Sequence, residues 1–474
     1  MSTTSLALNP VGASRLAGLR KWALLPVVLA GTAMVILDFF IVNVAMPATQ
    51  RDLHAGAGAI QWVVAGYGLA LAAGLITGGR LGDHFGRRKM FALGLALFTL
   101  TSAACGVAPN AEILVAGRVA QGLASALLMP QVLAIIGIAY EGEDRIKAIT
   151  AYALTLGLAA TAGQLIGGAL IQIDIAGLGW RSCFLVNVPV GIAALVLTAR
   201  VVPESRAAAS GRLDLVGAAL VTVGLVAFAL PLIDGRQYGW PTWTWLSLAA
   251  SPVLLGAFVL FQRRLAARGG SPLVAPALFR ERAFRVGLGM LVVFYSSVAS
   301  FFLVLALYLQ NGRGLSALDS GIVFSFEGIG FMATSMAGPA ITRRLGVQGL
   351  AAGAAIRAVA LAGFFVVVER IGGGGSVAWV ALALLLDGAG MGMVMGPSVQ
   401  LVLAKVSPEH AGAAAGVLAA AQQVGNAIGV ALIGVVFFGA LHHGVPQAFR
   451  LGLIGLVALS AVVVALVQRL PRSA

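Results

Sequence analysis

Fourteen apolar segments, each about long enough to cross a lipid bilayer as a helix, constrain this chain more than any other feature. A spanning helix needs roughly 20 mostly apolar residues. Because backbone polar groups must be paired inside lipid, long continuous apolar runs favour helices. The runs lie at about 22–46, 60–79, 90–107, 112–136, 148–172, 183–202, 213–233, 243–262, 285–309, 318–340, 346–368, 376–404, 412–438 and 448–468. We predict an all-α integral membrane protein with 14 transmembrane helices.

The overall composition excludes a soluble protein. Hydrophobic residues make up 59% of the chain and charged residues 10%, and the mean hydropathy is +0.97. Soluble chains are about one quarter charged, which provides the polar surface that this sequence lacks. We therefore expect the lipid bilayer to be the solvent of nearly the whole chain.

The basic residues predict the orientation of the spans, because cytoplasmic loops are enriched in Lys and Arg. With the N-terminus inside, 23 of the 31 basic residues lie in cytoplasmic segments and six in outer loops. We predict a multi-pass protein of a bacterial inner (plasma) membrane with both termini cytoplasmic. The alanine- and arginine-rich, lysine-poor composition is typical of a GC-rich bacterial genome. The net charge of +14 is then a topology signal, and no nucleic-acid partner is expected.

A weak internal repeat predicts two related halves. The segment 163–167 reads GQLIG and resembles GNAIG at 425–429, an offset of 262. The loop glycines Gly86 and Gly346 differ by 260. A shared offset in a membrane protein indicates duplicated bundles. The predicted division is a cytoplasmic tail 1–21, a six-helix bundle 22–202, two additional spans with a cytoplasmic linker 203–284, a second six-helix bundle 285–468 and a tail 469–474.

Five ionisable side chains fall deep inside predicted spans. They are three acids and two arginines: Asp38, Glu327, Asp387, Arg118 and Arg357. A charge at the bilayer centre costs at least about 2.5–3.5 kcal/mol, so such groups face a partner or a cavity. Asp38 and Arg118 lie at similar depths in the first half, as do Glu327 and Arg357 in the second. We expect one acid and one base to pair in each half.

These buried groups have two interpretations. Burial favours the neutral acid and a nearby arginine favours the carboxylate, so each acid is a candidate proton carrier that loads on one side of the membrane and unloads on the other. The alternative is a fixed ion pair that only orders the helices. Asp387 precedes a run of small residues, GAGMG at 388–392, and could instead face water.

A cytoplasmic loop at 79–89, GRLGDHFGRRK, combines glycines, one acid and several cations. Gly79 and Gly86 permit a tight turn, Asp83 can cap a neighbouring helix N-terminus or hold an arginine, and Arg87 and Arg88 are among the cations of the loop. We interpret the loop as a latch between helices that opens when the bundles move, with an ordinary positively charged loop as the alternative.

Several segments resemble one known family. The first span reads LDFFIVNVAMP at 37–47, the second begins QWVVAGY at 61–67, the fourth contains RVAQG at 118–122, and the sixth begins WRSCFLVNVPVG at 180–191. Together with the 79–89 loop, they resemble the fourteen-span drug–proton antiporters of the major facilitator superfamily. The resemblance runs in order through nearly the whole chain.

The resemblance implies a major facilitator fold, with two six-helix bundles plus two extra central spans, and alternating access driven by proton influx. It assigns the first-span acid to Asp38, the proton-linked arginine to Arg118 and the loop acid to Asp83. Its fifth-span antiporter motif corresponds to Gly163, Gln164, Gly167 and Gly168, although the family places proline where this chain has Gln164. Glu327, Arg357 and Asp387 are assigned to proton coupling on burial alone.

Other function classes are poorly supported. No Lys follows a Gly, so a Walker-type nucleotide site is absent, and no HExxH or GxSxG segment predicts an enzyme. We expect no catalytic residues, no metal and no cofactor. The predicted function is proton-coupled export of hydrophobic or cationic drugs or of a secondary metabolite. Uptake of a small organic solute is the alternative. The expected partners are a small amphipathic substrate, protons and lipid, and the expected state is a monomer.

Overall fold

The computed structural model describes residues 10–206, 214–371, 375–403, 406 and 411–470. In these residues the chain is helical, without strands, and 14 helices are long and apolar enough to cross a membrane. The predicted span count and fold class are confirmed. The predicted tails reach outside the described residues at 1–9 and 471–474, as do Lys405, Arg212 and Arg472 of the predicted cytoplasmic segments. The first helix already begins at Pro10, inside the predicted tail.

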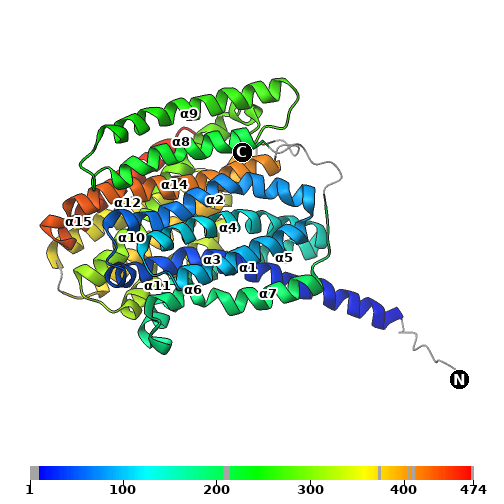
Figure 1. The fold of residues 1–474 in the computed structure, drawn as a ribbon, viewed down its shortest axis with the longest axis horizontal. Coiled ribbons are helices and arrows are strands. Elements are labelled where there is room, and N and C mark those ends of the chain that lie inside the picture. The colour runs from blue at the N-terminus through cyan, green and yellow to red at the C-terminus, as the bar shows by residue number, and fades with distance from the viewer. Residues whose placement is uncertain (1–9, 207–213, 372–374, 404–405, 407–410, 471–474) are drawn as a thin grey trace.

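The first six spans form one bundle (Figure 1). Its helices are α1 (Pro10–Asp52), α2 (Ala57–Phe85), α3 (Arg87–Gly106), α4 (Ala111–Ala139), α5 (Gly142–Ile173), and the short α6 (Ser182–Leu185) with α7 (Asn187–Val201), which together make the sixth span. The last six spans form the second bundle. Its helices are α10 (Arg282–Leu307), extended by the π-helical turn η4 (Tyr308–Gly312), α11 (Ala317–Leu345), α12 (Gln348–Ile371), α13 (Ala378–Leu403), α14 (Ala411–Ala440) and α15 (Val445–Val467).

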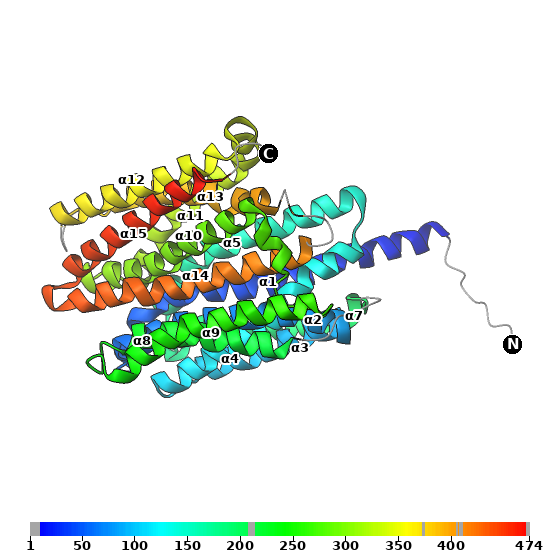
Figure 2. The ribbon, with the colours of Figure 1, turned by 90° about the horizontal axis from the view of Figure 1, so that it is seen from above.

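The two bundles repeat one packing scheme. In the first bundle α2 packs on α4, α3 on α4 and α7, and α1 on α5 and α7. In the second, α11 packs on α13, α12 on α13 and α15, and α10 on α14 and α15. Each helix of the second bundle therefore has the same neighbours as its counterpart in the first. The corresponding pairs are α1 and α10, α2 and α11, α3 and α12, α4 and α13, α5 and α14, and α7 and α15. Figure 2 shows α12 and α15 at one edge of the molecule and α3 and α4 at the other, with α1 and α14 between them.

The repeated glycines of the sequence serve the same purpose in each bundle. A Cβ on Gly163 of α5 would lie 3.1 Å from the Leu37 carbonyl oxygen of α1, and a Cβ on Gly425 of α14 would lie 2.5 Å from the Val292 carbonyl oxygen of α10. Small residues at helix contacts allow backbones to approach this closely, and a larger side chain would push the helices apart. The GQLIG and GNAIG segments thus mark equivalent helix contacts.

The bundles meet mainly through α5 with α11 and α2 with α14. We name the ends of the molecule by their loops: the basic end carries the α2–α3, α4–α5 and α9–α10 connections, and the far end is opposite. At the far end a Cβ on Gly168 would overlap the Ala317 backbone, and Gln310 donates to the Val44 carbonyl oxygen at 2.8 Å. Further along the same seam a Cβ on Gly328 of α11 would overlap the Thr161 side chain of α5, and a Cβ on Gly157 would be 3.8 Å from the nearest ring atom of Phe331.

The two additional spans, α8 (Leu215–Asp234) and α9 (Thr242–Ala267), form a hairpin that packs on α2 and α14 across the line where the bundles meet (Figure 1). At the far end the Trp62 indole donates to Asp234 at 3.1 Å, and Arg236 donates to the Phe438 carbonyl oxygen of α14. At the basic end Arg80 of α2 donates to the Ser271 carbonyl oxygen at 2.8 Å. The hairpin is therefore attached to both bundles.

Candidate functional site

The acid and the arginine predicted to pair in the first bundle form an ion pair. The Arg118 guanidinium of α4 donates to the Asp38 carboxylate of α1 through Nη1. Their side chains are at most 1% exposed. A buried pair of this kind holds its charges only if the remaining donors and acceptors are also satisfied.

Two neutral amides complete this hydrogen bonding. Gln121 donates to Asp38 Oδ1 at 3.0 Å and accepts from Arg118 Nη1 at 2.7 Å. Asn187 of α7 donates to the same Asp38 oxygen at 3.1 Å and to Ser102 of α3 at 3.0 Å. The carboxylate thus receives donors from three side chains. The sequence prediction gave no role to either amide, although Gln121 lies in the RVAQG segment and Asn187 in the WRSCFLVNVPVG segment.

The other side of Arg118 is held by α2. Its Nε donates to the Val63 carbonyl oxygen at 3.1 Å, and its guanidinium carbon lies 4.2 Å from the centre of the Tyr67 ring. This approach depends on Gly122, where a Cβ would overlap the Tyr67 carbonyl oxygen and lie 2.9 Å from the Ala70 Cβ. The small residue one turn after the arginine lets α2 and α4 touch, and the contact places a carbonyl and an aromatic face against the cation.

In the second bundle the structure corrects the predicted pairing. Arg357 of α12 forms its ion pair with Asp387 of α13, between Nε and Oδ1 at 3.6 Å, and not with Glu327. Depth along the span predicted Glu327 as the partner of Arg357, but Asp387 is on α13, the helix that packs directly against α12. All three side chains are at most 1% exposed, so Asp387 does not face water.

The run of small residues after Asp387 brings three helices together. A Cβ on Gly388 would overlap the Glu327 backbone of α11, and a Cβ on Gly390 would lie 2.6 Å from the Gly353 carbonyl oxygen of α12. Alternate small residues therefore face opposite neighbours of α13. This backbone contact places Glu327, Asp387 and Arg357 in one cluster, where Asp387 acts electrostatically on Glu327 and Arg357 acts on both acids.

The second cluster lacks the hydrogen bonds of the first. None of the four carboxyl oxygens of Glu327 and Asp387 has a hydrogen-bond partner in the described structure, and neither do Nε and Nη1 of Arg357. Arg357 Nη2 donates to the Ser297 carbonyl oxygen of α10 at 3.4 Å. The two clusters are thus similar in burial and different in hydrogen bonding.

The clusters also occupy different positions of the repeat. Gly122 contacts the Tyr67 carbonyl oxygen as Gly388 contacts that of Glu327, so Glu327 stands where the first bundle has Tyr67. Asp387 precedes Gly388 as Gln121 precedes Gly122, so an acid replaces a neutral amide. Similar depths therefore did not mean equivalent sites.

The loop predicted as a latch is attached within the first bundle. Asp83 accepts from Arg87 at 2.6 Å, and the Arg88 backbone N–H donates to Glu204 at 3.1 Å, just after α7. Gly86 has φ +113°, a conformation that favours glycine. The segment predicted as a loop at 79–89 is mostly helical, because α2 continues to Phe85 and α3 begins at Arg87. Gly79 is therefore not in the turn and makes only an ordinary contact, 3.5 Å from Pro130, whereas a Cβ on Gly82 would overlap the Gln131 side chain.

The antiporter-type segment of α5 contacts a different helix on each of two faces. Gly163 and Gly167 contact Leu37 and Ile41 of α1, while Gly168 contacts α11 in the other bundle. Gln164, which stands where the resembled family has proline, contributes its carbonyl oxygen to the α11 contact, and neither atom of its buried side-chain amide has a partner in the described structure. The segment is thus part of the seam between the bundles.

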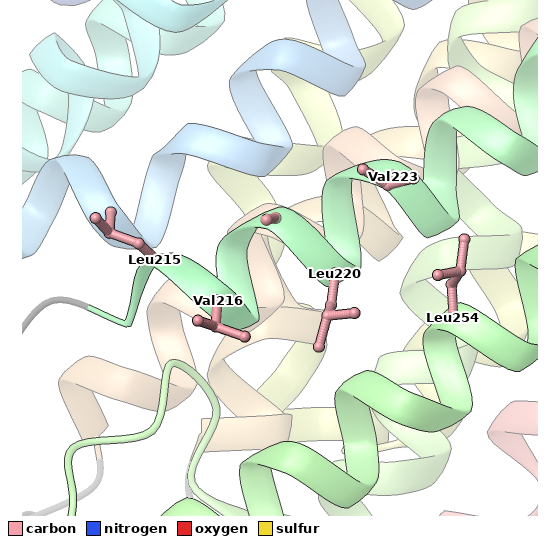
Figure 3. A pocket seen from close by; sticks show the side chains of 6 residues that line it. Leu215, Val216, Leu220, Val223 and Leu254 are labelled. Atoms are coloured by element: carbon pink, nitrogen blue, oxygen red, sulfur yellow. The ribbon is translucent and has the colours of Figure 1, made fainter.

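Two hollows are not associated with the buried charges. One of about 390 Å³ is lined only by aliphatic residues of α8 and α9, including Leu215, Val216 and Leu254 (Figure 3). Several of these side chains are exposed on spanning helices, as expected for a surface that faces acyl chains. The other, about 220 Å³, lies at the far end between α2, the α8–α9 hairpin and α14. The described residues contain no cluster of three or more His, Cys, Asp or Glu that could hold a metal.

Comparison with known proteins agrees with this architecture. Residues 28–430 match the family model described as Major Facilitator Superfamily. The chain is 37% identical over 429 residues to a probable actinorhodin transporter of Streptomyces coelicolor, covering 89% of this chain and 73% of that protein. It is 35% identical over 421 residues to a tetracenomycin C resistance and export protein of Streptomyces glaucescens, covering 88% and 76%. A crystal structure of the POT family transporter PepTSo has a TM-score of 0.69 at 16% identity, covering 94% and 97%, which is a likeness of fold alone.

Proposed function

The chain belongs to the major facilitator superfamily, and on this basis we propose that it is a proton-coupled antiporter that exports hydrophobic or cationic drugs or a secondary metabolite. The observation that carries the proposal is the similarity, over most of both chains, to proteins named for antibiotic transport and export. Proton coupling is supported by the buried Asp38–Arg118 pair. Such a pair can exchange charge for a proton when its surroundings change.

The contacts between the bundles support an alternating-access cycle. In the proposed cycle residues 22–202 and 285–468 move as two units, and the tight α5–α11 contacts at the far end support a present state that is closed there. If the basic end is cytoplasmic, as the distribution of Lys and Arg predicts, the present state is closed to the outside. Opening the far end requires Gly168 to separate from Ala317 and Gln310 to release the Val44 carbonyl.

In this mechanism Asp38 and Arg118 respond to the proton in the first bundle, and Glu327, Arg357 and Asp387 respond in the second. Gln121 and Asn187 position the Asp38 carboxylate, because both donate to it. Asp83, Arg87 and Arg88, with the turn glycine Gly86, hold the basic end of α2 and α3 while the bundles move, and Gly79 lies within α2.

Efflux by everted membrane vesicles tests the proposal. In a pump-deficient host, vesicles with the wild-type chain should concentrate ethidium when the interior is acid, and ethidium should release protons that a pH dye detects. Asp38→Asn should fold and lose both activities, whereas Asp319→Asn, the same change at an exposed acid, should keep them. Proton-driven ethidium movement out of the vesicles would favour uptake, and full activity of Asp38→Asn would remove Asp38 from the mechanism.

A further inference from the structure

The charges of the second cluster do not balance. Glu327 and Asp387 face a single cation, Arg357, and these are the charged groups that act on either acid. With both acids ionised, the cluster would hold one net negative charge in a setting at most 1% exposed. An unpaired charge buried in a protein costs several kcal/mol. One acid must therefore be neutral for the cluster to be stable.

The hydrogen bonds of the cluster also indicate that one of the two acids carries a proton. As carboxylates, Glu327 and Asp387 only accept hydrogen bonds, so two of them facing each other cannot bond. All four of their oxygens are in fact without a donor in the described structure. A proton on one acid supplies the missing O–H donor to the other. Two close carboxyl groups in low dielectric share a proton for this reason.

The first cluster has no such deficit. Asp38 and Arg118 balance one to one, and Asp38 accepts from Arg118, Gln121 and Asn187. A protonated Asp38 would present an O–H donor to three side chains that already donate to it, so the network favours the ionised carboxylate. The two buried clusters therefore have different protonation in the same conformation.

We infer that Glu327 and Asp387 form a carboxyl–carboxylate pair that holds one shared proton, balanced by Arg357, while Asp38 is ionised. The inference rests on the proposed antiport and assigns the proton of this conformation to the second bundle. The Glu327–Asp387 pair lies at the α11–α13 contact, where α11 also packs on α5 of the other bundle. A shift of the α5–α11 seam can thus separate the two acids and release the proton.

Infrared spectroscopy of the purified chain at neutral pH tests the assignment, because a protonated buried carboxyl has a C=O stretching band that shifts in D₂O. The wild-type chain should show one such group per molecule. Glu327→Gln and Asp387→Asn should each abolish the band, since the remaining acid balances Arg357 as a carboxylate. Asp38→Asn should keep it in full. Size-exclusion elution checks folding, and if one variant of the pair misfolds, the other makes the same test.

Three results would overturn the inference: no band in the wild-type chain, a band that persists in both pair variants, or a band lost in Asp38→Asn. Ethidium-driven proton release, measured on the same preparations, distinguishes failure of this inference from failure of the proposed antiport. A normal infrared pattern without proton release would remove the antiport and leave the shared proton. Proton release without the band would remove the pair and leave Asp38 as the carrier.

Discussion

Replacing each buried arginine by lysine should lower the free energy of unfolding by different amounts in the two clusters. Lysine keeps the positive charge but not the planar fork of donors or the aromatic stacking. At Arg118 the change removes the Nε bond to the Val63 carbonyl oxygen at 3.1 Å and the stacking over Tyr67 at 4.2 Å. At Arg357 it removes a 3.4 Å hydrogen bond to Ser297, ring contacts at 5.5 and 5.9 Å and the Nε that faces Asp387 at 3.6 Å, a separation too long for a hydrogen bond.

The expected losses differ by several kcal/mol. A hydrogen bond to a charged group contributes about 1.5–3 kcal/mol, and a desolvated cation–π contact contributes about 2 kcal/mol. Arg118→Lys should therefore lower the free energy of unfolding by about 3.5–5 kcal/mol. For Arg357→Lys the bond is long and the rings lie near the limit of about 6 Å for such contacts, so the loss should stay below about 1 kcal/mol.

The chain contains its own reporter for this measurement. Cys105 and Cys183 are free and buried, so a thiol-reactive dye fluoresces as heating exposes them. Because Cys105 contacts Gln121 in the Arg118 network, both variants should be compared in a Cys105→Ala background that leaves Cys183 as reporter. The reasoning fails if Arg357→Lys is destabilised as much as Arg118→Lys, or if Arg118→Lys unfolds at the wild-type temperature.

Two glycines give further predictions. A Cβ on Gly321 would lie 2.6 Å from the Gln164 carbonyl oxygen, so Gly321→Leu should destabilise the closed α5–α11 seam by about 1–3 kcal/mol and increase maleimide labelling of an Ala317→Cys reporter from the far end. Gly363→Leu, where nothing lies within 4 Å, is the control, and equal labelling of both would contradict the seam. Gly86→Ala should lose about 1–3 kcal/mol to its sparsely populated backbone conformation and also displace Glu204, 2.6 Å from the added carbon. Gly444→Ala has a similar backbone conformation, φ +93° and ψ 153°, with only Pro446 nearby at 3.9 Å, so the same thermal shift in both would exclude a Glu204 contribution.

The sequence alone was sufficient for the spans and for the identity of the buried charges. Length and hydropathy determine where a helix crosses lipid, because each residue adds about 1.5 Å and no polar backbone can remain unpaired there. The same rule identified Asp38, Arg118, Glu327, Arg357 and Asp387, since an ionisable residue in a long apolar run is conspicuous. The repeated glycines, compared by offset alone, also indicated the two bundles.

Only the tertiary structure decided which of these groups meet. Position along a span gives depth, but the neighbour that a side chain faces depends on how closely two helices approach and on the rotation of each about its axis. Arg357 pairs with Asp387 because Gly390 lets α12 touch α13, and Glu327 joins them because Gly388 lets α11 touch the other side. The side-chain amides of Gln121 and Asn187 are uncharged, so hydropathy does not single them out in a sequence. Both nevertheless donate hydrogen bonds to the Asp38 carboxylate. Contacts between backbones, set by small residues on facing helices, therefore determine the chemistry of charges that hydropathy can only locate.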